Sequence, residues 1–291
     1  MASVSQDVLV QFGRDSGLTG TAGYYATTEG TQHVIVGLAP AALTEVYWKS
    51  GQGVHQDTLT TFPTSRIVDI GAYFDPDDGT QHAIVATRDG ALTEVYWKSG
   101  QGVHQDVLTT FSAGIVTIAS YYVTGEQTQH VIVGTSDGML HEVFWKSGQD
   151  VHQDVLTTFS QGLTDVGAYF NSDEGTQHVI VGTSDGTLHE VFWKSGQGVH
   201  QDILASFSNT IVGVAGYYVP IGGTQHAIVG TVDGVLHEVF WKSGQGVHQD
   251  VLTTFPAGII DVGGYFNPDE GSQHAIASIH DGSLVEVFWR A

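Results

Sequence analysis

The amino-acid sequence predicts an all-β fold, a six-bladed β-propeller with four antiparallel strands in each blade. Three observations support this prediction. The segment EVYW or EVFW occurs six times, and its tryptophans are spaced by 49, 48, 48, 48 and 48 residues. All the aromatic residues, 6 Trp, 11 Tyr and 13 Phe, fall on five positions of this repeat. Four short β-like runs per unit, without helical periodicity, are typical of propeller blades of about 45 residues.

The fourth unit shows the four expected strands, which we name A to D. Strand A is the run at 162–170, and the turn cluster NSDEGT follows it. Strand B (177–183) is rich in β-branched residues and ends at the hairpin signal SDG. Strand C (187–193) alternates between two faces, and strand D corresponds to the run at 154–159. Two small residues precede the tyrosine of each A run, as in Gly167-Ala168-Tyr169, which suits an innermost strand around a crowded channel.

The order of these runs predicts how the ring closes. The sequence opens with a D-type run at 4–12 and stops just after the C-type run that ends at Trp289. We expect the N-terminal run to become the fourth strand of the C-terminal blade, which removes an open sheet edge. Residues 1–291 are thus expected to form a single propeller domain of six repeats of about 48 residues.

The composition excludes several classes of protein. Nine Lys and Arg against 31 Asp and Glu give a net charge of −22, so nucleic acid and anionic membranes are poor partners. The chain has no cysteine, hence no disulfide, thiolate nucleophile or Cys-ligated metal. A hydrophobic content of 41% excludes disorder. No apolar run is long enough to span a bilayer, and no secretory leader is visible, so the location in or outside the cell stays open.

One rim of the disc gathers the chemically capable residues. Because strands alternate in direction, the A–B and C–D loops share a rim, while the other rim offers only short turns. The first rim collects the sequence WKSGQGVHQ, with its tryptophan, glutamine and histidine, and six of the nine cations follow the tryptophans. These residues also have a purely structural interpretation: the tryptophans could pack between blades, and the lysines could be solvated partners of nearby carboxylates.

The 15 histidines raise the question of zinc. Their spacing does not match zinc ligands, and the acidic loops lack the full DxDxDG spacing of calcium sites, so we expect no metal and no cofactor. The histidines of the TQH motif, such as His178, suit a structural hydrogen bond from strand B to a neighbour. Those of the GVH motif, such as His200, lie in a glycine-flanked segment and are better candidates for ligand contact.

Repetition favours a binder over an enzyme. Catalysis needs one tuned constellation, whereas Glu190 and Asp202, which could pair as acid and base, have counterparts in all six units. Repeated equal sites instead give avidity for repetitive ligands, and cell-surface glycans are the obvious class. The alternatives are a protein-binding propeller scaffold and, less favoured, a glycan-processing propeller enzyme.

The repeated segment SDGxLHEVFWKSGQGVHQDVLTTF resembles the Photorhabdus-type propeller lectins along essentially the whole chain. This resemblance implies a multivalent, non-enzymatic lectin for fucose or O-methylated sugars, with sites between adjacent blades. Members of that family generally have seven blades, whereas this chain has six units. The fungal Aleuria-type fucose lectins have six blades, but their motifs do not match these residues.

The resemblance also implies which residues contact the sugar. Tryptophans would stack on it, and glutamines and GVH histidines would bond its hydroxyls, with the lysines as further donors. The sixth site should be defective because the termini interrupt its C–D loop and Ser5 replaces the histidine. Glycans are the expected partners, and association into a homo-oligomer stays open. The predicted carbohydrate-binding residues are Trp48, Trp97, Trp145, Trp193, Trp241, Gln52, Gln101, Gln149, Gln197, Gln245, His55, His104, His152, His200, His248, Lys49, Lys98, Lys146, Lys194 and Lys242.

Overall fold

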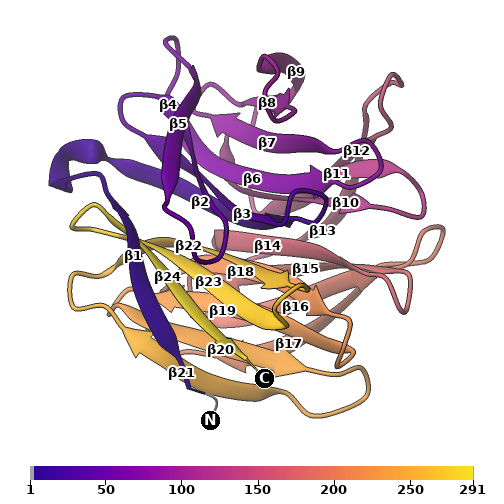
Figure 1. The fold of residues 1–291 in the computed structure, drawn as a ribbon. Helices are drawn as coiled ribbons and strands as arrows, with labels where there is room; N and C mark the ends of the chain where they lie inside the picture. The colour runs from indigo at the N-terminus through magenta and orange to yellow at the C-terminus, as the bar shows by residue number, and fades with distance from the viewer. Residues whose placement is uncertain (1–2, 291) are drawn as a thin grey trace.

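The computed structural model describes residues 3–290 and has six four-stranded antiparallel sheets arranged as the blades of a propeller (Figure 1). Blade 1 contains β2 (Leu18–Ala26), β3 (Thr31–Leu38), β4 (Ala42–Trp48) and β5 (His55–Thr61). Blade 2 contains β6 (Ile67–Asp75), β7 (Thr80–Thr87), β8 (Ala91–Trp97) and β9 (His104–Thr110). Blade 3 contains β10 (Ile115–Val123), β11 (Thr128–Thr135), β12 (Met139–Trp145) and β13 (His152–Thr158).

The second half of the chain repeats this arrangement. Blade 4 contains β14 (Leu163–Asn171), β15 (Thr176–Thr183), β16 (Thr187–Trp193) and β17 (His200–Ser206). Blade 5 contains β18 (Ile211–Val219), β19 (Thr224–Thr231), β20 (Val235–Trp241) and β21 (His248–Thr254). Blade 6 contains β22 (Ile259–Asn267), β23 (Ser272–Ile279), β24 (Ser283–Arg290) and β1 (Ser5–Gln11). A short 3₁₀ helix, η1 (Arg14–Ser16), connects blade 6 to blade 1.

Closure of the ring by the N-terminal strand is confirmed. Strand β1 pairs antiparallel with β24 from Ser5 opposite Phe288 to Gln11 opposite Ser283. Figure 1 shows the indigo β1 lying along the yellow β24. Beyond the paired stretch, Phe12 N donates to Gly282 O at 2.9 Å. The edge of β24 is therefore covered by the chain's own beginning.

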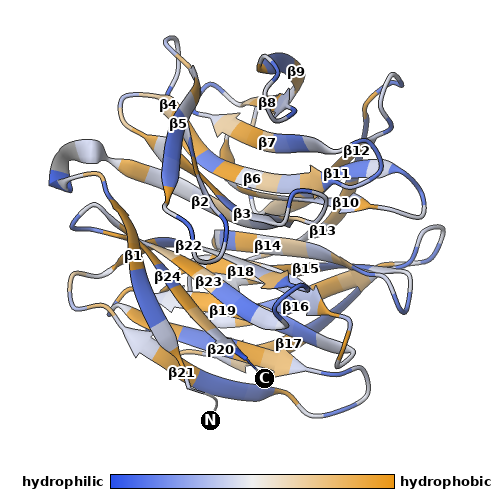
Figure 2. Cartoon of the chain, viewed as in Figure 1, coloured by the Kyte–Doolittle hydropathy of each residue, from blue (hydrophilic) through white to orange (hydrophobic). Residues whose placement is uncertain are grey.

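The predicted order of strands within a blade is also confirmed, with A innermost and D outermost. Close approach of inner strands explains the small residues: a Cβ on Gly167 would lie 2.5 Å from the Gly216 nitrogen of the next blade. The outer strands are mostly exposed, and β5 and β17 are largely hydrophilic in Figure 2. The D strands start earlier than predicted, at the GVH histidines. Each of these rings stacks on an aromatic ring of strand C, as His200 does on Phe192 with centroids 5.3 Å apart.

The hydrophobic core lies between blades. One cluster joins Leu140 and Phe159 of blade 3 to Val179, Val191 and Trp193 of blade 4, and the other clusters likewise combine two neighbouring blades. Burial of such apolar surface stabilises the ring by about 25 cal/mol per Å² removed from water. Each blade thus depends on its neighbours for its core.

At the channel, aspartates of the even-numbered blades connect one inner strand to the next. Asp69 Oδ2 accepts a hydrogen bond from Ile118 N of blade 3 at 2.7 Å, and Asp165 Oδ2 accepts one from Val214 N of blade 5 at 2.5 Å. Asp261 is the corresponding residue of blade 6, and all three are buried. Inner strands of different blades do not share a sheet, so these carboxylates supply polar links that the sheets cannot.

Candidate functional site

The pockets on the A–B/C–D rim lie between adjacent blades. The pocket between blades 4 and 5, called the 4/5 pocket, has a volume of about 460 Å³, and the 3/4 pocket about 420 Å³. One wall comes from the end of strand C and the C–D loop of the following blade. The other wall comes from strands B, C and D and the A–B loop of the preceding blade. The 4/5 pocket is lined by Glu174, Thr176, His178, Glu190, Phe192, Asp202, Ile203, Leu204, Gln225, Trp241, Lys242, Ser243, Gly244, Gln245 and Val247.

The predicted tryptophans lie at these pockets but are largely buried. All six are 5–6% exposed, and each packs against the core of the preceding blade, so the packing role that the sequence left open is real. Trp193 and Trp241 nevertheless line the 3/4 and 4/5 pockets. Only a small part of each of these two indoles is therefore accessible from its pocket, and the remainder supports the blade interface.

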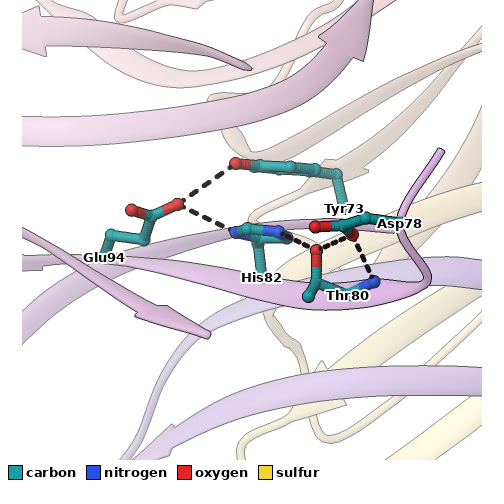
Figure 3. A network of polar contacts seen from close by, with 5 residues as sticks. All are labelled: Tyr73, Asp78, Thr80, His82 and Glu94. Atoms are coloured by element: carbon teal, nitrogen blue, oxygen red, sulfur yellow. Dashed lines mark hydrogen bonds and ion pairs between the residues drawn. The ribbon is translucent and has the colours of Figure 1, made fainter. Parts of the chain in front are cut away.

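A buried polar network of strands B and C lines the two described pockets, and Figure 3 shows the same network in blade 2. His82 Nδ1 lies 2.8 Å from Glu94 Oε1, and its Nε2 lies 2.7 Å from Thr80 Oγ1. The ring is stacked between Tyr73 and Tyr96, with centroids 4.7 and 6.0 Å away. The His–Glu pair recurs in all six blades at 2.8 Å. The TQH histidines are thus structural hydrogen-bonding residues, as the sequence favoured.

The network crosses from one blade to the next through the glutamine of strand B. Tyr169 of blade 4 donates to Gln225 Oε1 of blade 5 at 2.8 Å. At the preceding junction, the orientation of the Gln177 amide that satisfies its neighbours lets it accept from Trp193 Nε1 at 3.0 Å and donate to Glu142 Oε1 at 2.9 Å. Burial raises the pKa of Tyr169 well above its usual range, so the phenol keeps its proton. The tryptophan's indole nitrogen is thereby held by the strand-B glutamine of its own blade, and that glutamine in turn bonds the preceding blade.

Three of the predicted lysines donate hydrogen bonds to backbone carbonyls in the A–B loop of their own blade. Lys98 Nζ donates to Asp78 O at 2.7 Å, and Lys194 Nζ donates to Glu174 O at 3.2 Å. Lys194 is exposed and Lys98 is half-buried, and both hold the A–B loop of their own blade through these bonds. Lys242 makes the equivalent contact with Gly222 O at 3.3 Å and also lines the 4/5 pocket.

The predicted glutamines and GVH histidines separate in space. Gln197 and Gln245 lie in exposed C–D loops and line the 3/4 and 4/5 pockets. A turn hydrogen bond of 2.8 Å from Gln197 N to Lys194 O fixes this loop. His200 and its counterparts are exposed at the start of the outer strands, and His152 and His200 are not among the residues that line these two pockets.

At five of the six blade junctions, the described residues 3–290 include both the strands of the preceding blade and the C–D loop of the following blade. At the sixth, between blades 5 and 6, β24 runs to Arg290 and no C–D loop follows Trp289 in the described part of the chain. The sequence predicts this gap in the sixth unit. Ser5 lies there at the position of the GVH histidine, on the outer strand opposite Phe288. The wall that carries Trp48 faces residues of blade 6.

The charge of the pocket is mostly negative. Glu190 is buried and paired across the sheet with the exposed Asp202, and Glu174 lies on the A–B loop. Lys242 is the one cation among the lining residues of the 4/5 pocket. No three His, Asp or Glu side chains of residues 3–290 converge in a way that could hold a metal ion. No helix in this part of the chain is long and apolar enough to cross a membrane.

Neither a protein-family model nor a curated protein matches the sequence. Solved structures match the fold across nearly the whole chain. The BP39L lectin from Burkholderia pseudomallei is 16% identical, with a TM-score of 0.62 over 92% of this chain and 80% of that one. The SapL1 lectin in complex with alpha methyl fucoside is 13% identical, with a TM-score of 0.70 over 93% and 92%.

An enzyme shares the fold as well. The NanB sialidase from Streptococcus pneumoniae is 8% identical, with a TM-score of 0.71 over 98% of this chain and 70% of that one. At these identities the similarities concern the propeller fold. They confirm the predicted fold class, and the Photorhabdus-type resemblance remains a prediction from the repeat motif.

Sequence reasoning missed the second wall of the pocket. Thr176, His178 and Glu190 were assigned to structure or to a hypothetical acid–base pair, yet they line the pocket with the next blade's tryptophan. The available signal was the near-invariance of TQH and the Glu-Val pair of strand C in all six units, which exceeds what strand formation alone requires. Which blade faces which loop depends on the direction in which the ring closes, and the repeat pattern does not contain that information.

Proposed function

We propose that the protein is a multivalent, non-enzymatic lectin that binds fucose or O-methylated sugars in the pockets between its blades. The observation that carries this proposal is that the 3/4 and 4/5 pockets match, each with an indole, a loop amide and a set of carboxylates, and that the repeat provides the same residue types at three further junctions. An indole offers an apolar surface to the C–H face of a sugar, and Gln245 and Asp202 offer groups for its hydroxyls. The propeller lectins with the same fold support this interpretation.

The charges favour a neutral sugar. A sialic acid or other anionic ligand would meet Glu174, Glu190 and Asp202 with one lysine to balance them. The chain has nine Lys and Arg in total, and none of the lining residues of the 3/4 or 4/5 pocket is an arginine. A sialidase-like activity therefore has little electrostatic support here, despite the shared fold.

Repetition explains how weak sites could serve a biological role. A single site with a millimolar dissociation constant contributes about −4 kcal/mol. Several such sites on one rim can engage one glycosylated surface at the same time, and their avidity exceeds the single-site affinity by about 10² to 10⁴. The two described pockets lie on the same rim, and the repeat provides matching residues at three further junctions of that rim, which supports a multivalent mode of binding.

Isothermal titration calorimetry with methyl α-L-fucoside and O-methylated sugars tests the proposal, supported by a glycan array. Because the tryptophans support the core, the discriminating variant is Ala at Gln52, Gln101, Gln149, Gln197 and Gln245, which lie in the C–D loops. We expect this variant to fold normally and to lose at least about tenfold in affinity, since each hydroxyl loses a polar partner. Absence of any binding by the native protein, with turnover of a glycoside or capture of a defined protein ligand instead, would favour the alternative functions.

A matched variant decides the role of the GVH histidines. Ala at His55, His104, His152, His200 and His248 changes the outer strands without altering the lining of the described pockets. Retained binding assigns the sugar to the pocket between the blades. Lost binding, with an unchanged melting temperature, moves the contact to the outer side of the rim.

A further inference from the structure

The six blades are not equivalent at the rim, because two kinds of blade alternate. Strand A ends in Tyr-Tyr in blades 1, 3 and 5 and in Tyr-Phe in blades 2, 4 and 6. The A–B loops alternate in the same way. The even-numbered blades carry DPDDG, NSDEG and NPDEG, whereas the odd-numbered blades carry the unrelated ATTEG, VTGEQ and VPIGG. In strand A and the A–B loop, the molecule is therefore a threefold repeat of a two-blade unit.

This alternation creates a hydrogen bond at every second junction, which we call the clasp. Tyr218 of blade 5 donates to Asp173 Oδ2 in the A–B loop of blade 4 at 2.5 Å. Tyr122 donates to Asp77 at 2.7 Å between blades 3 and 2. Tyr25 closes the set by donating to Asp269 of blade 6 at 2.5 Å.

The loop that carries each clasp aspartate is held from within as well. Asn171 Oδ1 accepts hydrogen bonds from Asp173 N at 3.1 Å and Glu174 N at 3.2 Å. Asn267 and Asp75 take the same position in the other even-numbered blades and bond the amides of Asp269 and Asp77. The odd-numbered blades have Ala26, Val123 and Val219 there, which have no side-chain acceptor.

The other junctions lack the clasp on both sides. Phe74 and Phe170 replace the donor tyrosine, and Thr28 and Gly125 replace the acceptor aspartate. Among residues 3–290 no side-chain hydrogen bond of this kind joins blade 1 to blade 2 or blade 3 to blade 4. The two described pockets fall on opposite sides of this division, since 4/5 has the clasp and 3/4 does not.

The clasp connects the two walls of the pocket. Asp173 is adjacent in sequence to Glu174, whose side chain lines the 4/5 pocket, and Tyr218 belongs to the blade that supplies Trp241 and Gln245. The 3/4 pocket is lined by Glu126 in the same position, on a loop without these restraints. A wall that is already ordered loses less conformational entropy when a ligand binds.

Resting on the lectin function proposed above, we infer that the ring carries two alternating classes of sugar pocket: three clasped pockets of higher affinity, at 2/3, 4/5 and 6/1, and two open pockets of lower affinity, at 1/2 and 3/4. Tyr25, Tyr122 and Tyr218 act as positioning residues for the A–B wall. The difference between the classes should be about three- to tenfold in dissociation constant, the effect of one net hydrogen bond.

Each pocket has its own reporter, the indole N–H of its tryptophan. Titration of the full-length protein with methyl α-L-fucoside, followed by two-dimensional ¹⁵N NMR, gives a dissociation constant for every indole signal. Single Trp→Phe variants assign the signals. We expect Trp48, Trp145 and Trp241 to titrate together at lower concentration, and Trp97 and Trp193 together at higher concentration.

Replacing the three clasp tyrosines by phenylalanine (Y25F, Y122F, Y218F) should move the first group to the affinity of the second. The signals of Trp97 and Trp193 are internal controls and should keep their constants, which a general loss of structure would not allow. Conversely, G125D with F170Y introduces a clasp at the 3/4 junction and should lower the dissociation constant reported by Trp193 alone. F170Y without G125D is its matched control and should change nothing.

The outcomes separate this inference from the proposed function. Five indoles that titrate with one constant, unaffected by the tyrosine variants, overturn the two classes and leave the lectin function standing. An absence of any shift with the fucoside or other sugars overturns both. Equal weakening of all five pockets in the triple variant shows a structural role only, and it too overturns the inference.

Discussion

Gln177 illustrates, at the scale of single residues, why positions in this repeat cannot vary freely. Its amide meets Tyr121 and Glu142 of blade 3 and Trp193 of its own blade, and the residue is 6% exposed. A buried amide with three partners in two blades is both an interface contact and the base of a pocket. The same glutamine position recurs in every unit, so this connection is repeated around the ring.

Replacing Gln177 by leucine should lower the free energy of unfolding by about 1–3 kcal/mol, because the buried Glu142 and the Trp193 indole each lose a hydrogen-bond partner. Urea unfolding measures this change. Gln197→Leu is the matched control, since Gln197 lies in an exposed loop and a surface substitution changes stability by about 0.5 kcal/mol at most. Equal unfolding free energies for the two variants would contradict the inter-blade role of Gln177.

The two glutamines also show what could be predicted from sequence at this scale. The loop glutamine, lysine and tryptophan could be placed on the rim because strand direction follows directly from the repeat. The polar base of the pocket could be predicted only in part: the TQH histidines suited a structural hydrogen bond, but the repeat does not show that their glutamate partner and the next blade's tryptophan line one pocket. The alternation of Tyr-Tyr and Tyr-Phe was visible in the sequence, but aligning the six units on their shared residues hides it.

At the scale of strands, β1 is the element on which ring closure depends. It contributes Leu9 and Val10 to a core cluster with Leu284 of blade 6 and Val34 of blade 1. It also occupies the outer edge of β24, which would otherwise expose unpaired backbone groups. Its place in the C-terminal blade could be predicted, because six A, B and C runs leave the N-terminal D run without another partner.

Deleting residues 1–12 should therefore destabilise the protein and promote association through β24. We expect a melting temperature lower by about 10 °C or more, given the lost strand pairing and the loss of buried leucine and valine side chains. Differential scanning calorimetry and size-exclusion chromatography report the two effects. Deletion of residues 1–4 is the control, because it leaves β1 whole. An unchanged, monomeric 1–12 deletion would show that closure does not depend on this strand.

For the whole molecule, the three channel aspartates predict how stability responds to pH. Burial raises the pKa of Asp69 to about 6 and raises those of Asp165 and Asp261 well above their usual range. The charges of the other channel aspartates raise the pKa of Asp165 and Asp261 further. Each folded-state pKa therefore exceeds the value of about 3.9 expected for the unfolded chain.

The sign of the effect follows from proton linkage. A carboxyl whose pKa is raised by folding binds more protons in the folded state, so its stabilising contribution is complete below pH 4 and is lost as the pH rises through the folded value. Between pH 5.5 and pH 8 the unfolding free energy of the native protein should fall. Other acidic groups of this chain, with its net charge of −22, contribute to the same trend, so a single variant must isolate the channel.

Asp165→Asn supplies that comparison. Its amide oxygen can still accept from Val214 N, and its NH₂ can donate to Thr117 Oγ1, so both contacts of the carboxyl have a substitute. Urea unfolding of both proteins at several pH values between 5.5 and 8 gives the difference in free energy. We expect the native protein to lose stability relative to the variant as the pH rises, because the variant no longer carries an ionisable group there. A difference that stays constant, or that grows in favour of the native protein with rising pH, would show that Asp165 is ionised in the folded ring at neutral pH. The channel carboxylates would then act as charged acceptors for the inner strands rather than as protonated ones.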